Sequence, residues 1–246
     1  VLPSNTTGHR NIAIGSGAMA YNTTGERNVA IGNWVLPSNT TGTRNIAIGN
    51  GTMEKNTTGH RNVAIGSSSM EKNTTGFWNV SVGSYALYKN TTSARNTAIG
   101  TGALNSSTGA KNTATGHAAM YYNTIGSRNT ASGMAALAYN TTGSYNTVIG
   151  ALAGGYNTRG NRNVFIGASA GNHAAYQTQS NKLVIANGGT SANELITGDF
   201  AAHTVNINGS LHATGSVTTS DGRLKKDIQP LTHALDSILQ LEGKTY

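Results

Sequence analysis

The chain of 246 residues contains no cysteine, few charged residues and no long hydrophobic segment. Without cysteine, disulfide bonds and thiolate metal sites are excluded. No apolar run approaches the roughly 18 residues that a membrane-spanning helix requires, so no membrane span is expected. Charged residues make up 11% of the chain, against about a quarter in typical globular proteins. With 32 glycines in the same chain, we expect a structure in which backbone hydrogen bonds carry much of the order.

Aromatic residues, at 6%, and acidic residues, of which there are nine, are also scarce. The low aromatic content and the lack of a helix for the major groove argue against nucleic acid as a partner. Glycosidases generally use two carboxylates about 5 to 10 Å apart. The repeats place Glu54 and Glu71 at one position, each followed by a lysine, which we interpret as a solvated charge ladder. The seven histidines have no metal-ligand spacing, so neither a metal nor a cofactor is expected.

A 17-residue repeat occupies most of the chain. A phrase that begins as Asn-Ile-Ala-Ile-Gly at Asn11 occurs ten times, with a step of 17 residues except for one step of 16 between Asn96 and Asn112. Counted from this Asn, position 5 is always Gly, position 9 is Met or Leu in eight copies, and positions 12–15 read Asn-Thr-Thr-Gly or a variant. We place the residue missing from the 16-residue copy between Leu104 and Ser106, which predicts a tighter corner there.

Each repeat predicts one short strand and two corners. The Asn-x-Ala-Ile segment alternates β-branched and small residues, which is typical of a strand. Gly at position 5 and the Asn-x-x-Gly phrase indicate turns, because Gly and Asn tolerate positive φ. One repeat cannot bury its own apolar face, so successive coils must stack. We therefore predict an all-β, parallel β-solenoid shaft over residues 1–171, about ten coils and roughly 50 Å long.

Stacking turns every position of the repeat into a ladder. We expect the Asn ladder to bond side-chain amides from coil to coil, and the Ile and Met/Leu ladders to form a thin core. Alternation then directs Ala at position 3 away from that core, as a row of small residues that admits a neighbouring chain. This row predicts an intertwined homotrimer. Gly154 and Gly171 replace Met or Leu in the last two copies, so we expect the core ladder to end there.

Position 17 forms a basic ladder. Residues 1–171 contain 12 basic and 3 acidic residues, a net charge of +9. Like charges about 5 Å apart would form a stripe that could hold anionic surface glycans. Alternatively, the guanidinium groups stack and bond corner carbonyls of the same or a neighbouring chain. The ladder consists of Arg10, Arg27, Arg44, Arg61, Arg95, Lys111, Arg128 and Arg162.

Aromatic residues in coils 2 to 5 are a further candidate for contact with sugars. Trp34, Phe77, Trp78, Tyr85 and Tyr88 could form one sugar-stacking patch, or they could simply pack at the corners.

The periodicity stops at Asn172, and residues 172–219 predict a β-rich neck. Strands are expected at residues 182–186, 194–196, 204–207 and 210–219, separated by glycines. Residues 220–246 differ again, with a charged turn followed by Pro230, which suits the first position of a helix. Hydrophobic residues then recur at spacings of 3 and 4, which predicts an amphipathic helix at about 230–241.

The repeat phrase Asn-x-Ala-Ile-Gly-x-x-Ala resembles the head repeats of trimeric autotransporter adhesins, which are left-handed parallel β-rolls. The resemblance covers about residues 5–171, and it implies a β-solenoid of the left-handed β-roll type and a trimer. The repeats of those adhesins are shorter, so the coil of this chain requires a longer corner.

The segment from Ser220 to Ile228, followed by Pro230-Leu231, resembles the first part of the C-terminal intramolecular chaperone domain of phage tail fibres, endosialidase tailspikes and some bacterial surface proteins. The resemblance implies trimerisation and self-cleavage before Ser220, with Ser220 as nucleophile and Lys225 as its base. A desolvated lysine can activate a serine in this way. Alternatively, both are ordinary turn residues, since about 27 residues of the domain are present and the chain continues past Ser220.

These observations predict an extracellular structural and adhesive fibre that is not an enzyme, apart from any self-cleavage. The first choice is a phage tail fibre that attaches the virion to a glycan or protein receptor on the host surface. The alternatives are a bacterial cell-surface adhesin or extracellular filament, and a polysaccharide-cleaving tailspike. The eight residues that open the chain recur at 35–42, so we expect a piece of a longer protein.

Overall fold

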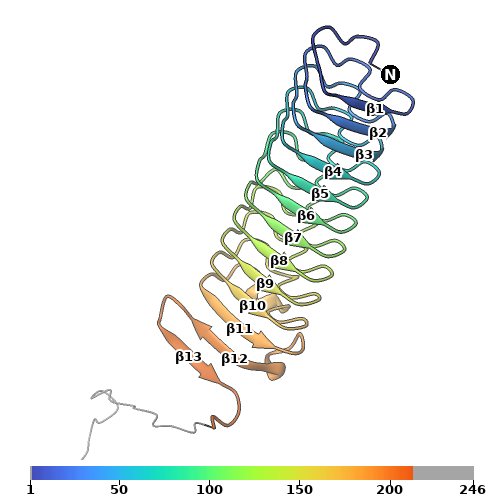
Figure 1. Ribbon diagram of the computed structural model, residues 1–246. Coiled ribbons are helices and arrows are strands. Elements are labelled where there is room, and N and C mark those ends of the chain that lie inside the picture. Colours follow the sequence, from blue (N-terminus) through green and yellow to red (C-terminus); the bar gives the residue numbers. More distant parts are fainter. Residues whose placement is uncertain (1, 213–246) are drawn as a thin grey trace, which may run out of the picture. The chain divides into compact units, whose positions relative to one another are not determined.

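The computed structural model describes residues 2–212 of the chain, and its first ten strands form one parallel sheet (Figure 1). Each repeat contributes one strand, and each strand residue pairs with the residue one repeat further on, as Ala47 does with Ala64. The prediction of an all-β parallel solenoid is confirmed. The strands are β1 (Ile12–Ile14), β2 (Val29–Asn33), β3 (Ile46–Asn50), β4 (Val63–Ile65), β5 (Val80–Val82), β6 (Thr97–Ile99), β7 (Thr113–Thr115), β8 (Thr130–Ser132), β9 (Thr147–Ile149) and β10 (Val164–Ile166).

The corners of each coil depend on residues with positive φ. At position 5, Gly66 has a φ of +125°, and a Cβ there would lie 2.7 Å from the carbonyl carbon of Gly83 in the next coil. Positions 9 and 17 adopt the left-handed conformation without glycine, as Met53 (φ 52°) and Arg44 (φ 57°) do. That conformation costs a non-glycine residue about 1–2 kcal/mol. At position 9 the complete burial of Met53 offsets this cost.

The interior of the coil is lined by small residues, and the prediction for the two strand faces was wrong. Ala30, Ala47 and Ala64 at position 3 are fully buried, whereas Ile46 and Ile65 at positions 2 and 4 are 40% and 37% exposed. The coil is narrow, and Met or Leu at position 9 already fills its centre. Small residues such as alanine, or Ser81, fit opposite that side chain, so the β-branched face of the sheet points outward.

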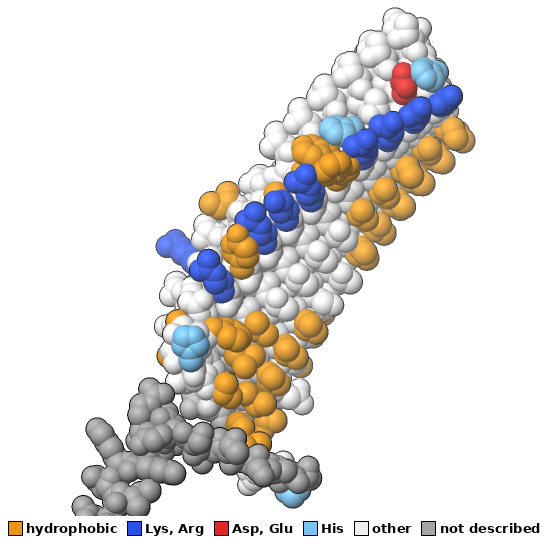
Figure 2. Space-filling view, turned by 60° about the vertical axis from the view of Figure 1, so that its left-hand side comes forward, with side chains coloured by type: hydrophobic (Ala, Val, Ile, Leu, Met, Phe, Trp, Pro, Cys, Tyr) orange, Lys and Arg blue, Asp and Glu red, His pale blue; other side chains and the backbone are white. Residues whose placement is uncertain are grey.

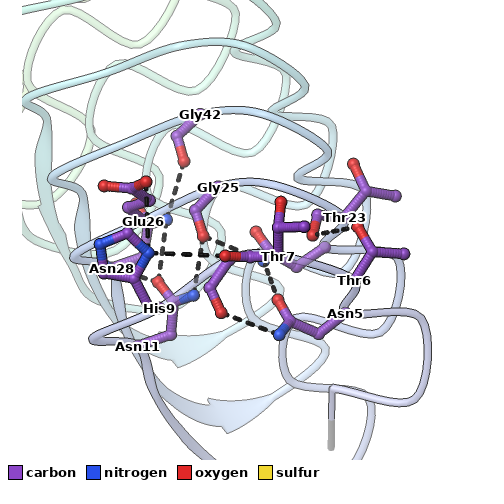
Figure 3. Close-up of polar contacts among 12 residues, drawn as sticks. Asn5, Thr6, Thr7, His9, Asn11, Thr23, Gly25, Glu26, Asn28 and Gly42 are labelled. Atoms are coloured by element: carbon purple, nitrogen blue, oxygen red, sulfur yellow. Dashed lines mark hydrogen bonds and ion pairs between the residues drawn. The ribbon is translucent and has the colours of Figure 1, made fainter.

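Two ladders of buried asparagines run through the interior, as predicted. Figure 3 shows the N-terminal end of the array, with Asn5 at position 12 and Asn11 and Asn28 at position 1. At position 1, the Asn28 amide donates to the carbonyl of Gly42 at 2.8 Å, and its Oδ1 accepts from the backbone N–H of Asn45 at 2.9 Å. At position 12, the Asn39 amide donates to Asn22 Oδ1 at 2.8 Å. These bonds satisfy polar groups that would otherwise be buried without a partner, at a cost of about 1–3 kcal/mol each.

The residue missing from the 16-residue coil lies one corner later than predicted. Asn123 donates to the hydroxyl of Ser107 at 3.0 Å, so Ser107 takes the place of the ladder asparagine. The Thr108 N–H then bonds the carbonyl of Thr124, which keeps the same register. The gap therefore falls between Thr108 and Gly109. The shorter Ser107 side chain leaves the buried Oδ1 of Asn90 without a partner in the described chain.

The same gap explains one exception at position 15. This glycine does not adopt positive φ, contrary to the prediction, but it is required because the coils stack closely. A Cβ on Gly59 would lie 2.7 Å from the carbonyl oxygen of Gly76 in the next coil. Ser93 is the one non-glycine residue at this position, and the coil that follows it is the shortened one.

The core continues through the last two repeats, where we had expected it to end. Phe165 replaces the alanine of position 3 and is fully buried. A Cβ on Gly154 or Gly171 would lie 2.8 or 2.7 Å from its ring. The two glycines thus make room for one large side chain that fills the volume of two missing Met or Leu residues. Tyr176, in the 3-10 helix η1 (Ala174–Tyr176), packs on Phe165 with ring centroids 5.6 Å apart.

Three further strands extend the sheet. β11 (Lys182–Ala186) pairs in parallel with β10, and β12 (Glu194–Asp199) and β13 (Thr204–Ile207) follow as antiparallel strands. A second 3-10 helix, η2 (Ser191–Asn193), precedes β12. The predicted helix at about 230–241 and most of the strand predicted at 210–219 lie outside the described residues. Within residues 2–212, no helix is long and apolar enough to cross a membrane.

Candidate functional site

The basic ladder forms one row along the solenoid, and its regularity comes from the backbone (Figure 2). Each position 17 has a φ between 55° and 62°, and from Arg27 onward its N–H bonds the preceding coil, as Arg44 N–H bonds the carbonyl of Glu26 at 2.9 Å. The asparagine that follows points into the core, so the basic side chain points out. The members are all exposed: Arg10, Arg27, Arg44, Arg61, Arg95, Lys111, Arg128 and Arg162.

Corner carbonyls do not hold these side chains within the described chain. The carbonyl of each position 16 accepts a hydrogen bond from the backbone N–H of the next position 17, as Thr43 does from Arg61. These carbonyls therefore already have a donor. The one side-chain hydrogen bond of the ladder in residues 2–212 runs from Arg128 Nη1 to the Tyr145 hydroxyl, at 2.5 Å. The guanidinium groups are therefore available to an external partner.

Two aromatic residues interrupt the ladder and separate its charges. The guanidinium carbons of Arg61 and Arg95 lie 5.6 and 4.8 Å from the ring centroid of Trp78. Arg128 and Arg162 flank Tyr145 in the same way, at 5.1 and 5.7 Å. A cation over an exposed aromatic ring is stabilised by about 0.5–1 kcal/mol. Each ring thus orders two cations and relieves part of the repulsion along the row.

Acidic groups that could neutralise the stripe are nearly missing from its surroundings. In the described chain, no ladder residue has a carboxylate within the 4.0 Å of an ion pair. Glu26 pairs with His9 at 3.3 Å (Figure 3). Glu54 bonds Lys55 at 2.6 Å, and this contact raises the pKa of Lys55 above its ordinary value. Glu26 and Glu54 are therefore engaged elsewhere, and the ladder keeps its positive charge.

The five aromatic residues proposed as one patch belong to separate groups. Phe77 and Trp78 lie beside the basic ladder, where their rings meet edge to face at 5.4 Å. Tyr85 and Tyr88 lie on a different corner, at positions 7 and 10, with ring centroids 5.6 Å apart. Trp34 shares position 7 with Tyr85 but lies three coils away and covers Gly17. Spacing along the sequence does not show which corner a side chain occupies, and the coil geometry does.

The outward face of the sheet carries a hydrophobic stripe that sequence reasoning had assigned to the core. In β1 to β6 this stripe consists of Ile and Val with one Thr, in β7 and β8 it changes to Thr and Ser, and in β9 and β10 Ile and Val return. Figure 2 shows hydrophobic side chains beside the basic row towards the N-terminal end of the solenoid and again towards its distal end. The most exposed members are Ile12 and Ile14, at 51% and 57%.

The two residues named for self-cleavage, Ser220 and Lys225, lie outside the described residues. Across residues 2–212, no group of three or more His, Asp or Glu side chains could hold a metal ion.

The family described as the chaperone of endosialidase matches residues 220–246. This match supports a C-terminal chaperone domain of the endosialidase and phage-fibre type, which begins shortly after the β-solenoid ends. No curated protein and no solved structure matches the chain. The combination of a β-solenoid with this chaperone segment fits a protein of the phage tail-fibre or tailspike type.

Proposed function

We propose that the chain is the shaft of a trimeric phage tail fibre that attaches the virion to its host. The observation that carries this proposal is the order of its parts. A β-solenoid of ten coils is followed, after strands β11–β13, by a segment matched by the endosialidase chaperone family. Such a rod supplies reach, and its exposed surface supplies sites for a glycan or protein receptor. The protein acts outside the host cell, as part of the virion.

Trimerisation is supported by the hydrophobic stripe. Extended apolar surface on a soluble protein marks a site of association, and the stripe repeats one pattern over successive coils. Three identical rods in register would bury these Ile and Val side chains against one another. The partner of each shaft is thus a further copy of this chain, and the contact uses Ile and Val rather than the alanine row.

Analytical ultracentrifugation of the full chain tests the trimer. We expect a trimer for the unaltered protein and dissociation for Ile46→Lys, because a charge on this exposed position would be buried in the interface. Thr58→Lys, on another exposed face of the same coil, should remain trimeric. A monomer at micromolar concentration in the unaltered protein would refute this part of the proposal.

The basic ladder is the part of the shaft that we assign to anionic glycans of the host surface. Three substitutions, Arg27→Gln, Arg44→Gln and Arg61→Gln, should together lower the salt concentration at which the protein elutes from immobilised heparin. Lys55→Gln is the matched control, since Lys55 is already paired with Glu54. A wild-type protein that fails to bind heparin at low salt would remove this role.

A bacterial cell-surface adhesin is the second candidate, favoured by the resemblance of the repeats to trimeric autotransporter heads. It shares the trimer and the rod and differs in how the protein reaches the surface. Immunogold labelling with an antibody to the solenoid separates the two, because it should mark virion tails in one case and bacterial envelopes in the other.

Self-cleavage before Ser220 is a separate proposal that rests on the resemblance of residues 220–228 to the chaperone domain. Mass spectrometry of the complete reading frame should show a fragment that ends at Thr219, and Ser220→Ala should abolish it. An uncut chain would show that the two residues belong to an ordinary turn.

A further inference from the structure

A second surface of the solenoid, on the corner formed by positions 7, 10 and 11, changes its chemistry midway along the rod. At position 11, three coils carry lysine, the next carries Ser106, and the following three carry tyrosine. The coil of Ser106 also has Gly102 at position 7, so it has little side-chain bulk on this corner. A coil with small side chains on this corner thus lies between two coils that carry tyrosines there.

This arrangement creates a notch of about 670 Å³, within the range of about 300–1,000 Å³ usual for ligand sites. One wall consists of Tyr85 and Tyr88, and the other of Tyr121 and Tyr122, whose ring centroids are 4.7 Å apart. The ring of Tyr121 leans over Gly102, where an added Cβ would lie 3.1 Å from it. The absence of a side chain at Gly102 therefore shapes the notch.

The polar groups of the notch come from side chains and not from the backbone. Thr101, Asn105, Ser106, His117 and Lys89 line it together with the tyrosines, and the Asn105 amide already donates to the Tyr85 carbonyl at 3.1 Å. The backbone N–H groups of Asn105 and Ser106 already bond the carbonyls of Gly102 and Tyr121, at 3.2 and 3.1 Å. These two N–H groups are therefore not available to the backbone of a peptide strand.

Lys89 adds a positive charge at the rim. Lys55 bonds Glu54, but the residue before Lys89 is Tyr88, and in the described chain no carboxylate lies within ion-pair distance of Lys89. In the preceding coil, the Lys72 ammonium lies 5.4 Å from the ring centroid of Tyr88. An anionic group in the notch would therefore meet positive charge without competition from an acid.

From these features we infer that the notch binds a saccharide that carries a carboxylate. A sugar ring presents C–H faces that stack on tyrosine rings, and its hydroxyls bond side chains such as Ser106 and Thr101. Its carboxylate faces Lys89. The inference deepens the proposed function and rests on it, since it names the receptor chemistry of an attachment fibre and a site distinct from the basic ladder.

The neighbouring coils extend the aromatic surface. Tyr122, Tyr139 and Tyr156 stack with centroids 5.3 and 6.4 Å apart and with rings 13° and 12° from parallel. They line a second groove of about 460 Å³ that shares Tyr121 and Tyr122 with the notch. Further sugar rings of the same chain can follow this track. The track uses positions 7, 10 and 11, so the sheet face at positions 2 and 4 can be covered by other copies while the notch stays open.

Isothermal titration of the trimeric full chain with tetragalacturonate, and with maltotetraose as the neutral analogue, tests the inference. We expect the acidic sugar to bind at least tenfold more tightly than the neutral one, and Lys89→Gln to remove most of this difference. Ser106→Tyr continues the tyrosine ladder into the notch, so it should abolish binding although it adds an aromatic ring. Tyr21→Ala, an exposed position 11 tyrosine away from both grooves, should bind as the unaltered protein does.

Three outcomes overturn the inference: no binding of either sugar at millimolar concentration, equal binding of the two sugars, or binding that survives Ser106→Tyr. The parent proposal is checked separately by the attachment of labelled fibre to host cells. If the fibre attaches and Ser106→Tyr attaches equally well, the notch is not the receptor site and the attachment role stands. If the sugar binds but the fibre does not attach to cells, the inference of a sugar site in the notch is supported and the proposed attachment role is refuted.

Discussion

The array β1–β10 and the distal strands β11–β13 belong to one sheet but are held in different ways. Eight of the ten array strands have only three residues, yet each belongs to a coil whose interior holds alanines, a Met, Leu or Phe side chain and buried asparagines. The distal strands have five, six and four residues, and β13 is exposed along its whole length. A strand inside a closed coil needs little pairing of its own, because its coil supplies the core.

In the distal part, individual polar pairs hold neighbouring elements together in place of a closed coil. Lys182 Nζ bonds Asp199 at 2.5 Å between β11 and β12, and this contact lowers the pKa of Asp199. The Tyr176 hydroxyl bonds Glu194 at 3.1 Å. Such contacts are sensitive to pH, whereas the asparagine ladders contain no titratable group. The two regions should therefore respond differently to substitution and to pH.

The largest effect is expected where the two regions meet. Phe165→Ala should destabilise the distal end of the solenoid by about 3–5 kcal/mol, since it empties a fully buried volume. The substitution Gly171→Met, added to Phe165→Ala, restores the Ala and Met pair that other repeats carry at positions 3 and 9 and should recover a large part of the loss. Urea denaturation measures both. A double variant no more stable than Phe165→Ala would show that Phe165 does not substitute for the Met/Leu ladder.

The asparagine ladder should give the next largest effect. Asn62→Ala removes the donor to the Gly76 carbonyl and the acceptor for the Asn79 N–H, at 2.8 and 3.0 Å, and both groups are buried. We expect a loss of about 2–5 kcal/mol. Asn50→Ala, an exposed asparagine, is the control and should change the free energy of unfolding by less than about 0.5 kcal/mol. Equal losses in the two variants would contradict the role of the ladder.

A smaller effect is expected from the glycine of position 5. Gly66→Ala places a Cβ 2.7 Å from the backbone of the next coil, and overpacking of this kind costs about 1–3 kcal/mol. Gly51→Ala is the comparison, because its nearest neighbour would be the Ser68 hydroxyl at 3.7 Å. A similar stability of the two variants would show that the coils can separate locally.

The smallest effect is a dependence on alkaline pH at the contact of Tyr176 with Glu194 in the distal part. Burial and the bond to Glu194 raise the pKa of Tyr176 from about 10 to about 12. The protonated phenol is thus favoured in the folded state, and its contribution is present below pH 10 and lost as the pH rises towards 12. Tyr176→Phe should remove this dependence. Near-ultraviolet circular dichroism can follow it, and an identical alkaline transition in the variant would refute the assignment.

The period of the repeat predicted the solenoid, the parallel sheet, the asparagine ladders and the basic row, because each follows from stacking one unit on the next. The inside and outside of the strand could not be predicted in the same way. Alternation shows that Ile46 and Ala47 face opposite sides, but not which side is the core. The width of the coil decides that, and it depends on Met53 and on the two asparagines that share the interior.

The sequence also did not reveal that a residue at one position of the repeat compensates for smaller residues at another position. Compared with the Met or Leu that other repeats carry at position 9, Gly154 and Gly171 indicate that the core ends there. Phe165, at position 3, restores the missing volume. Only the three-dimensional structure of the coil shows that its ring lies against both glycines. The tyrosine notch has the same origin, since it depends on one small coil between two aromatic ones and on the corner that they share.

The sequence by itself determined the unit, its number and its register, because a fixed period with invariant glycines permits only one way to stack the coils. The tertiary structure decided which side chains lie inside and which surfaces remain available. The physical reason is space: a narrow coil accepts Ala, Asn and one long side chain, and it directs Ile, Arg and Tyr outward. The surfaces proposed for assembly and for binding are formed by the residues that the core could not contain.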